Sequence, residues 1–400
     1  MNTARPSGTS TVLAQPIRGR QRFLSRIRTM GALGIKLMFH SKLKLIGTLL
    51  GVVFAVVLSN QQAGSFLGLV DKNVMFIRNT DCDLWIAPRS AEVVGPGKLS
   101  ASALSQALVT EGVAEASPML IGGASVLLPD GGFQQVTLVG TKFPDYRGGP
   151  WNIVAGSREA LGRSDTVFFE DSERELLGGL NVGSVREVNG RRITVGGFTW
   201  GLIPFGPSYA FADFEVAREL LKTPQDQITF VLVKLKPGAD IGAVKTALSR
   251  SLPDAKVLDK QDFETSTISF MLNKTSIGVT FGTSTAFGLL VGFVIVALSM
   301  FSAVVDNIRE FGTLKAIGVT NYDLSILLFV QSVAYALMGS VVGLAIVAQL
   351  AKIIRSAKLA LSLPPALTLA TIAMMILMCV FASSLALLRL RKVEPAMVFR

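Results

Sequence analysis

The sequence predicts an α-helical membrane protein with four transmembrane helices, arranged one then three, and a large extracytoplasmic α+β domain inserted between helices 1 and 2. Half of the residues are apolar and only 17% are charged, a balance typical of membrane proteins. Four stretches carry no charge, and each exceeds the ~20 residues that span a bilayer as a helix. They are residues 45–70, 275–305, 324–351 and 359–388, and a segment of soluble composition, 71–274, follows the first.

The positive charge of the chain lies beside these stretches. Residues 1–44 hold nine Lys or Arg and no acidic residue, whereas the 71–274 segment is mildly acidic. Basic flanks stay on the cytoplasmic side, so we expect both termini inside and the 71–274 domain outside. The basic turn with Lys352, Arg355 and Lys358 argues against this orientation, but the bias around the first helix is stronger. Since the basic residues act as topology signals, we expect no nucleic-acid partner.

The two ends of the chain are predicted to stay at the inner membrane surface. Residues 1–19 are polar and rich in Pro, Gly, Ser and Thr, which predicts a disordered tail. Residues 20–44 combine apolar and basic residues at helical spacing, which predicts an amphipathic cytoplasmic helix in contact with membrane lipids. A plain charged tail is the alternative. Residues 389–400 form a second basic cytoplasmic tail.

The predicted outer domain contains two regions with different sequence patterns. Residues 226–262 read as strand, turn, helix and strand, and together with a strand at 82–87 and a helix at 100–109 they predict a βαβ subdomain. Residues 120–212 show short strands separated by glycine turns, which predicts an inserted β-rich subdomain. Within that stretch, Asn189-Gly190 between two alternating runs indicates a hairpin.

Both connections between this domain and the membrane are predicted to be helical stalks. From Phe66 to Ile77, apolar residues recur at helical spacing while charged residues appear. The 275–305 stretch would be ~46 Å long as a helix, which exceeds a ~30 Å hydrocarbon core. We expect the two helices to emerge from the bilayer and to pack together. Simple tilting of the second helix is the alternative.

A search for catalytic residues finds none. The single histidine, His40, lies among basic residues at the inner surface. The 95–98 text, GPGK, lacks the spacing of a phosphate-binding loop and is interpreted as a turn. Asp81 and Asp83 are interpreted as a solvated strand edge rather than an acid pair. The sequence therefore predicts no catalytic residue, no metal site and no cofactor bound by this chain, and a membrane enzyme is the least favoured class.

Paired glycines at GxxxG spacing occur in three of the apolar stretches. Small residues let helix backbones approach closely, so these glycines are predicted to pack helices, either within one subunit or between two copies. The pairs are Gly47 with Gly51, Gly288 with Gly292, and Gly339 with Gly343.

The predicted cytoplasmic loop 306–323 contains the most specific local sequence motif. It predicts a short amphipathic helix that ends at Gly318, with Ile308, Phe311, Leu314 and Ile317 on one side. Such a helix can dock in a groove of a partner, and resting on the lipid surface is the alternative. The candidate coupling residues are Ile308, Arg309, Glu310, Phe311, Gly312, Leu314, Lys315, Ala316, Ile317 and Gly318.

The text NIREFGTLKAIGVTNYDL, residues 307–324, resembles the loop motif of the FtsX-like permease family. The tail, RLRKVEPAMVFR, resembles the ending of that family, and VLVKLKPGADIGAVKTAL resembles the closing βαβ unit of the MacB-type periplasmic core. The text CDLWIAPRS looks closest to the stand-alone DevC-type permeases. The resemblance covers about residues 40–400. Gln331 departs from it, because several relatives carry Glu there. The residues that fit the loop motif are Glu310, Gly312, Leu314, Ala316, Ile317 and Gly318.

The resemblance implies a non-catalytic permease subunit of an ABC-type export system in a bacterial inner membrane. It implies a dimer, a separate cytoplasmic ATPase that binds ATP and Mg, and a loop helix that lies against this ATPase. Relatives with large outer domains also contact a periplasmic adaptor that leads to an outer-membrane channel. Lipid-like or small hydrophobic products are the expected cargo. The alternative is an FtsX-type signalling protein that regulates an extracytoplasmic cell-wall hydrolase, although that branch tends to have a smaller outer domain.

Overall fold

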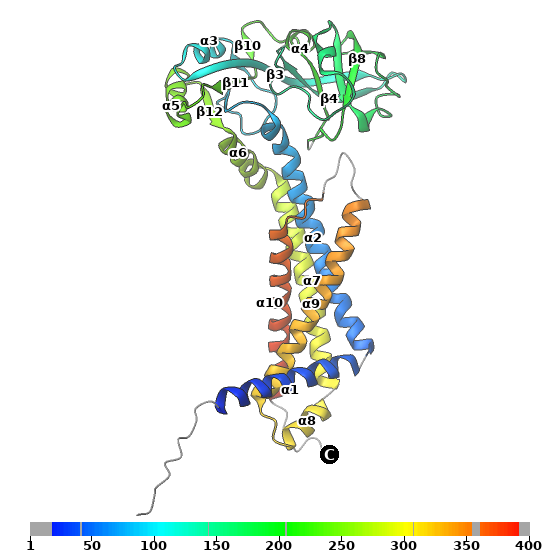
Figure 1. The fold of residues 1–400 in the computed structure, drawn as a ribbon. Coiled ribbons are helices and arrows are strands. Elements are labelled where there is room, and N and C mark those ends of the chain that lie inside the picture. Colours follow the sequence, from blue (N-terminus) through cyan, green and yellow to red (C-terminus); the bar gives the residue numbers. More distant parts are fainter. Residues whose placement is uncertain are drawn as a thin grey trace, which may run out of the picture. The chain divides into compact units, whose positions relative to one another are not determined.

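The structure is a computed structural model that describes residues 18–40, 42–142, 144–204, 206–306, 308–353 and 361–391 (Figure 1). The chain divides into two compact units. The helical unit comprises Met1–Asn60, Thr285–Ala348 and Pro364–Arg400, and the sheet unit comprises Gln61–Ser284 and Gln349–Leu363.

Four helices in the described chain are long and apolar enough to cross a membrane. They are α2 (Lys42–Asn79), α7 (Ser276–Asp306), α9 (Asn321–Ile353) and α10 (Pro365–Arg391). The last helix begins later than the uncharged stretch 359–388, because Pro364 and Pro365 lie within that stretch. Proline fixes its own φ and is favoured at the first position of a helix, so it sets the start of α10.

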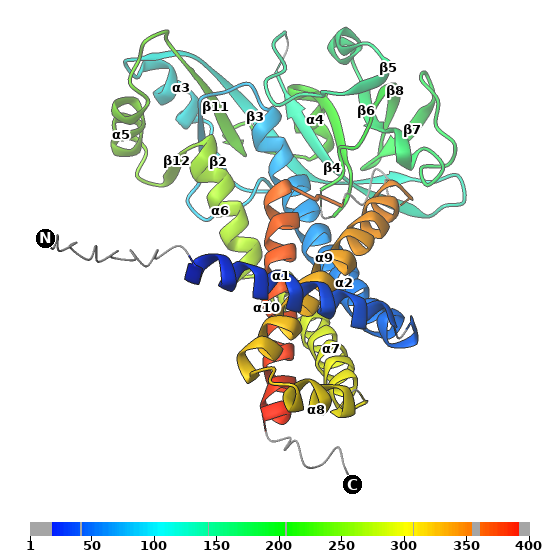
Figure 2. The same cartoon turned by 60° about the horizontal axis from the view of Figure 1, so that its bottom comes forward.

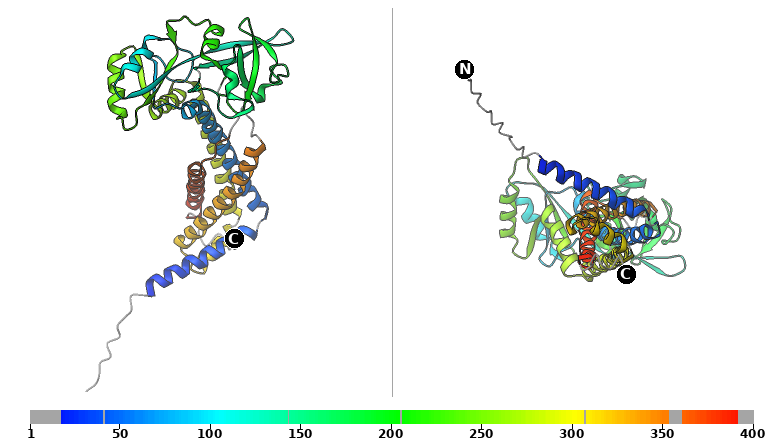
Figure 3. Two further views of the ribbon diagram at one scale, coloured as in Figure 1. Left: turned by 45° about the horizontal axis from the view of Figure 1, so that its top comes forward. Right: turned by 90° about the horizontal axis from the view of Figure 1, so that it is seen from below.

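Two shorter helices complete the helical unit. The first, α1 (Arg18–His40), runs across the long helices rather than along them (Figures 1 and 3), and α8 (Ile308–Ala316) follows α7. The predicted 20–44 helix ends earlier than expected, since residues from Lys42 onward already belong to α2. The predicted disorder of 1–19 lies outside the described residues up to position 17, and the tail 389–400 lies outside them from position 392.

The sheet unit is built on a mixed sheet with the strand order β12-β1-β11-β3-β4-β9-β6-β8-β5, and β7 pairs with β3 and β8 (Figure 2). A separate two-stranded pair joins β10 to β2. The strands are β1 (Leu84–Pro88), β2 (Leu99–Ser100), β3 (Val113–Leu127), β4 (Phe133–Thr141), β5 (Ile153–Gly156), β6 (Thr166–Glu170), β7 (Val185–Val188), β8 (Arg191–Thr199), β9 (Tyr209–Asp213), β10 (Gln227–Ile228), β11 (Phe230–Leu235) and β12 (Ala255–Asp259). The helices are α3 (Ser102–Val109), α4 (Phe214–Leu220), α5 (Ile241–Ser251) and α6 (Lys260–Asn273), with 3-10 turns η1 (Arg158–Gly162) and η2 (Asp171–Glu173).

Alternating side chains of β1 place the sheet between two apolar layers. Leu84 and Ile86 pack in the cluster that includes α3 and α5, whereas Trp85 and Ala87 pack in the cluster that includes the end of α2 and Phe263 of α6. Successive strand residues point to opposite faces, so both faces of β1 are buried. This explains the uninterrupted apolar text of the strand.

The strands predicted as an inserted β-rich subdomain do not form a sheet of their own. The 15-residue strand β3 pairs with β11 along its first half and with β4 along its second half. One continuous sheet therefore contains strands of both the predicted βαβ subdomain and the predicted β-rich subdomain. The predicted hairpin is confirmed: Val188 lies opposite Arg191, and both turn residues, Asn189 and Gly190, have positive φ, as a two-residue type I′ turn requires.

Candidate functional site

The loop between α7 and α9 carries α8, the region predicted to couple to a partner. Phe311 is buried in the apolar core of the helical unit, and Leu314 packs against the same core. Next to α8, the ammonium of Lys44 at the start of α2 lies 3.1 Å from the carboxylate of Asp306, the last residue of α7. One side of α8 is therefore held against the bundle.

The end of α8 is fixed by a glycine. Gly318 has φ +98°, a left-handed conformation that only glycine adopts without strain. The N–H of Val319 donates to the carbonyl of Leu314, and the N–H of Gly318 donates to the carbonyl of Lys315, both at 3.0 Å. These two bonds define a Schellman motif, so the helix ends at the residue that the sequence predicts.

The following helix begins with a reciprocal cap. The N–H of Thr320 donates to Oδ2 of Asp323 at 3.0 Å, and the N–H of Asp323 donates to Oγ1 of Thr320 at 3.3 Å. This is a capping-box arrangement with Asp in the place of Glu. Only Val319 lies between Gly318 and the cap, so the connection from α8 to α9 has little conformational freedom.

The prediction that four apolar residues share one side of α8 is wrong for Ile317. Ile308 is 37% exposed and Ile317 is 79% exposed, whereas Phe311 and Leu314 face the core. Ile317 follows the last helical residue and belongs to the capping turn, where helical spacing no longer applies. The exposed side of α8 thus combines apolar and charged groups. Of the other candidates, Arg309, Glu310, Ala316 and Gly318 are exposed, Lys315 is half-buried and Gly312 is buried.

The GxxxG glycines pack helices of the same chain against each other. A Cβ at Gly292 would lie 2.2 Å from Cβ of Ala55, and one at Gly339 would lie 2.4 Å from a methyl group of Val52. These contacts place α2 against α7 on one side and against α9 on the other. Packing within one subunit therefore accounts for five of the six glycines: Gly51, Gly288, Gly292, Gly339 and Gly343. A Cβ at Gly47 would meet nothing within 4 Å.

Two polar side chains inside the helical unit bind neighbouring helices. Gln331 of α9 donates from Nε2 to the carbonyl of Gly34 in α1 at 2.8 Å. A carboxylate could not donate this bond, so the glutamine ties α1 to α9. The hydroxyl of Thr371 in α10 donates to Oδ1 of Asn60 in α2 at 3.3 Å, and Asn60 is fully buried.

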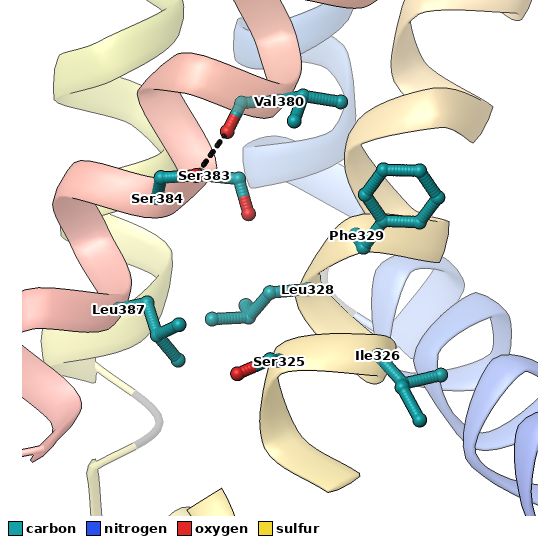
Figure 4. A pocket seen from close by; sticks show the side chains of 8 residues that line it. All are labelled: Ser325, Ile326, Leu328, Phe329, Val380, Ser383, Ser384 and Leu387. Atoms are coloured by element: carbon teal, nitrogen blue, oxygen red, sulfur yellow. Dashed lines mark hydrogen bonds between the residues drawn. The ribbon is translucent and has the colours of Figure 1, made fainter. Parts of the chain in front are cut away.

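A pocket of about 270 Å³ lies between the first turns of α9 and the last turns of α10 (Figure 4). The hydroxyl of Ser325 donates to the carbonyl of Asn321, and that of Ser384 donates to the carbonyl of Val380, both at 2.8 Å. Since these hydroxyl protons are used within their own helices, the lining is largely apolar. Its residues are Ser325, Ile326, Leu328, Phe329, Val380, Ser383, Ser384 and Leu387.

In the sheet unit, the last turns of α2 are enclosed by aromatic rings. The ring of Phe76 lies 5.1 Å from that of Tyr209, 5.4 Å from that of Trp151 and 6.3 Å from that of Trp85, centre to centre. Edge-to-face and tilted contacts of this kind add to the hydrophobic effect. We call these four residues the aromatic socket. It fixes the predicted outer stalk in the core of the sheet unit.

A polar chain that the sequence analysis missed lies next to the socket. Lys72 of α2 donates from Nζ to the carbonyl of Gly201 at 2.7 Å. Buried Glu170 in turn accepts from the N–H of Gly201 at 2.6 Å and from that of Leu202 at 3.0 Å. Burial raises the pKa of Glu170, although the two N–H bonds favour its charged form. The only signal in the sequence was a glutamate closing an apolar strand.

The acidic pair that the sequence singles out belongs to an ion network. Lys234 lies 2.9 Å from Asp81 and 3.4 Å from Asp83, and Arg147 lies 3.1 Å from Asp81. The hydrogen bond from Lys234 holds the pKa of Asp81 below its usual range. Among the described residues, no group of His, Cys, Asp or Glu is arranged to hold a metal ion. The geometry thus supports a structural role for the pair.

The bundle of long apolar helices, the capped loop helix and the large mixed sheet together define a membrane protein of the permease class. Residues 45–251, more than half of the chain, match the MacB-like periplasmic core domain, and residues 282–395 match the FtsX-like permease C-terminal domain. The chain belongs to the FtsX/MacB-type family of ABC permeases. The resemblance to FtsX-like and MacB-type permeases stated from the sequence is confirmed.

Two solved structures are similar to part of this chain. The periplasmic region of MacB from Actinobacillus actinomycetemcomitans is 13% identical, with a TM-score of 0.37, and the match covers 48% of this chain and 94% of that one. The extracellular domain of the noncanonic ABC-type transporter YknZ from Gram-positive bacteria is 14% identical, with a TM-score of 0.33, and the match covers 44% of this chain and 99% of that one. No curated protein matches the chain.

Membership in this family makes the chain a transmembrane part of an ABC-type transporter in the inner membrane. It implies an ABC ATPase as a partner, which carries the ATP hydrolysis. The four apolar helices and the large periplasmic-type domain fit the family.

Proposed function

We propose that the chain is the permease subunit of an export system, in which a separate cytoplasmic ATPase docks on α8 and drives a motion of the periplasmic domain. The observation that carries this proposal is the two-sided character of α8. Phe311 anchors one side in the bundle, Glu310 is exposed on the helix, and Ile317 is exposed in the capping turn that follows it. A helix that combines exposed apolar and charged groups suits a groove on a partner protein.

The path of the motion is supported by α2. This helix runs without a break from Lys42 to Asn79, and its two ends belong to different compact units. Close contacts of α2 with Gly292 and Gly339 fix it at one end, and the aromatic socket fixes it at the other. A packed helix transmits displacement along its axis because protein interiors are barely compressible.

The proposal also assigns a cargo class and further partners. The lining of the pocket between α9 and α10 suits an acyl chain, which supports lipid-like or small hydrophobic cargo. A second copy of the chain would complete the permease, and a periplasmic adaptor with an outer-membrane channel would receive the cargo. Both termini and α8 then lie in the cytoplasm.

The test measures ATPase stimulation in nanodiscs. The full chain is reconstituted with the ABC ATPase that co-purifies with it, and the ATP hydrolysis rate is compared between the original chain and Ile317→Asp. A carboxylate buried without a partner in the docking groove is expected to reduce stimulation at least about tenfold, equivalent to ~1.4 kcal/mol. The matched control is Val109→Asp, since Val109 is 84% exposed on α3.

Three outcomes would contradict the proposal. Undiminished stimulation by Ile317→Asp would remove the docking role of α8. Full activity of the purified chain with no ATPase present would show that the chain does not need an ATPase partner. Activation of a cell-wall hydrolase by the complex, with no ATP-dependent transfer of fluorescent phospholipid out of the nanodisc, would replace export by signalling.

A further inference from the structure

One edge of β3 is incompletely paired. On this edge β11 accompanies β3 only as far as Met119, and β7 meets it at Val126. Between these two points, the part of the chain that the structure describes supplies no strand on that side. We call this interruption the β3 gap.

Side chains at both ends of the β3 gap take the place of a strand. The N–H of Ile121 donates to Oγ1 of Thr229 at 3.0 Å, and the N–H of Ser125 donates to Oδ1 of Asn189 at 2.8 Å. Gly123 lies midway between them and is exposed. The backbone groups on either side of Gly123 are therefore satisfied by this chain.

The pairing on the opposite edge shows where the polar groups of Gly123 point. Gly123 lies opposite Thr137 of β4, and the N–H of Thr137 donates to the carbonyl of Ser208, away from β3. In an antiparallel ladder, such residues form a non-hydrogen-bonded pair, and both direct their N–H and C=O outward. Gly123 consequently presents one donor and one acceptor to the β3 gap.

A cavity of about 570 Å³ occupies the gap, within the size range of ligand pockets. Gly123, Leu221 and Thr229 contribute to its lining, together with two cationic side chains, Lys98 and Lys222. The segment 71–274 that contains this cavity is acidic overall. The two lysines therefore make the cavity a local exception in charge.

At two positions that line the cavity, the residue type does not suit the local backbone structure. A Cβ at Gly123 would meet nothing within 4 Å, and its φ is not positive, so neither packing nor backbone geometry requires glycine there. Glycine in the interior of a strand weakens it and often marks a site where another backbone approaches closely. Lys222 has φ +52° in the capping turn after α4, a position that usually holds glycine. Such departures cluster at functional sites.

We propose that the β3 gap binds an extended peptide segment that carries an acidic side chain, supplied by an extracytoplasmic partner protein. One residue of the segment exchanges two backbone hydrogen bonds with Gly123, as in β-strand addition. Its acidic side chain pairs with Lys98 and Lys222. The absence of a side chain at Gly123 leaves room for the approaching backbone. This binding depends on the sheet unit alone and not on the coupling role of α8.

The experiment measures peptide binding to the full chain in nanodiscs by fluorescence anisotropy, without any ATPase. The probes are two pools of N-acetylated, C-amidated pentapeptides with Val or Thr around a central residue, which is Asp in one pool and Lys in the other. We expect the Asp pool to bind at least about tenfold more tightly than the Lys pool. Binding is also expected to slow amide hydrogen exchange at Gly123.

Two variants separate binding from folding. Gly123→Val adds a branched side chain beside the free donor and acceptor of the strand edge, and Lys222→Gly removes a charge while relieving the backbone. We expect both variants to keep or raise the thermal midpoint, since valine favours strands and glycine favours a positive φ, and yet to weaken binding of the Asp pool at least about tenfold. The matched control is Lys142→Gln, an exposed lysine outside the cavity, which is expected to bind normally.

Several results would overturn the proposal. These are equal binding of the two pools, undetectable binding of both, or unchanged binding by Gly123→Val and Lys222→Gly. Displacement of the Asp pool by inorganic phosphate, or by vesicles of phosphatidylglycerol, with no change in Gly123 exchange, would assign the cavity to a phosphate or a lipid headgroup instead.

Discussion

The ammonium group of Lys72 lies 2.7 Å from the carbonyl oxygen of Gly201, a residue 129 positions later in the chain. The N–H of Leu202, which belongs to the same peptide unit as this carbonyl, donates to buried Glu170 at the end of β6 at 3.0 Å. A side chain of the stalk helix is thereby connected through one peptide unit to the interior of the sheet. Displacement of α2 along its axis would act directly on this peptide.

Replacing Lys72 with Met should loosen the peptide at Gly201 and Leu202. Loss of a hydrogen bond from a charged donor is expected to destabilise the sheet unit by about 1.5–3 kcal/mol. Amide hydrogen exchange at these two positions should accelerate relative to the original chain. Lys142→Met serves as the control at an exposed site, and equal exchange in the two variants would dissociate the stalk from this peptide.

Replacing Gly292 with Ala should separate α2 from α7. The added Cβ would lie 2.2 Å from Cβ of Ala55, and overpacking of this kind costs about 1–3 kcal/mol. Denaturation in mixed micelles measures the loss. Gly47→Ala is the matched control in the same motif, because a Cβ there meets nothing within 4 Å. If Gly292→Ala dissociated a dimer while monomer stability stayed constant, packing within one subunit would be the wrong interpretation.

Replacing Gly318 with Ala should weaken the end of α8. The left-handed conformation costs a residue with a Cβ about 1–2 kcal/mol, so the bond from the N–H of Val319 to the carbonyl of Leu314 should open more often. Faster exchange of the Val319 amide reports this change, and Thr313→Ala is the exposed control on the same helix. ATPase stimulation should fall for Gly318→Ala and for Glu310→Ala while membrane insertion persists. Normal stimulation by both would contradict the proposed docking.

The native thiols should stay unlabelled by maleimide in the folded chain. Burial raises the pKa of Cys82 to about 12, so the thiolate is scarce near neutral pH, and Cys379 is fully buried. Single cysteines at Val109 and Thr313 can therefore be added without removing the native ones. The Val109 variant should react from outside and the Thr313 variant only after permeabilisation. The reverse pattern would invert the membrane orientation.

The buried carboxyl of Glu170 should give the sheet unit a pH-dependent contribution to stability. Its pKa is raised in the folded state, so the folded chain holds this proton more tightly than the unfolded chain. The contribution becomes more favourable as the pH falls through the raised pKa. Asp81, whose pKa is lowered, acts in the opposite direction.

Comparison of the original chain with Glu170→Gln isolates the contribution of Glu170 to the pH dependence of stability. The difference in thermal midpoint between the two should shift in favour of the original chain as the pH is lowered from about 7.5 to about 5. A difference that does not change with pH would show that Glu170 titrates alike in both states.

Local patterns were sufficient for several elements. Charge-free length locates the four long helices, and the Asn189-Gly190 turn and the helix end at Gly318 follow from residues with special backbone freedom. These features depend on neighbours within a few positions. The start of α10 can also be predicted from the sequence, because Pro364 and Pro365 favour the first position of a helix.

The remaining features depend on pairs that are distant in sequence. The position of β3 between β11 and β4, and the bond from Lys72 to Gly201, join segments whose local text does not specify a partner. The side on which Ile317 lies was mispredicted, because helical spacing was extended past the last helical residue. The β3 gap could not be predicted from local sequence, and neither could the strand order. It is bounded by Thr229 and Asn189, which are distant from β3 in the sequence.

The pairing of β1 has a consequence for biogenesis. In the membrane orientation proposed above, this strand is among the first to reach the far side of the membrane during synthesis, yet its two neighbours are β11 and β12, with Leu84 opposite both Val233 and Asp259. The sheet can close only after nearly the whole outer segment has been translocated. Such non-local pairing slows folding and leaves apolar strands uncovered, so the nascent domain is expected to need chaperone protection during secretion.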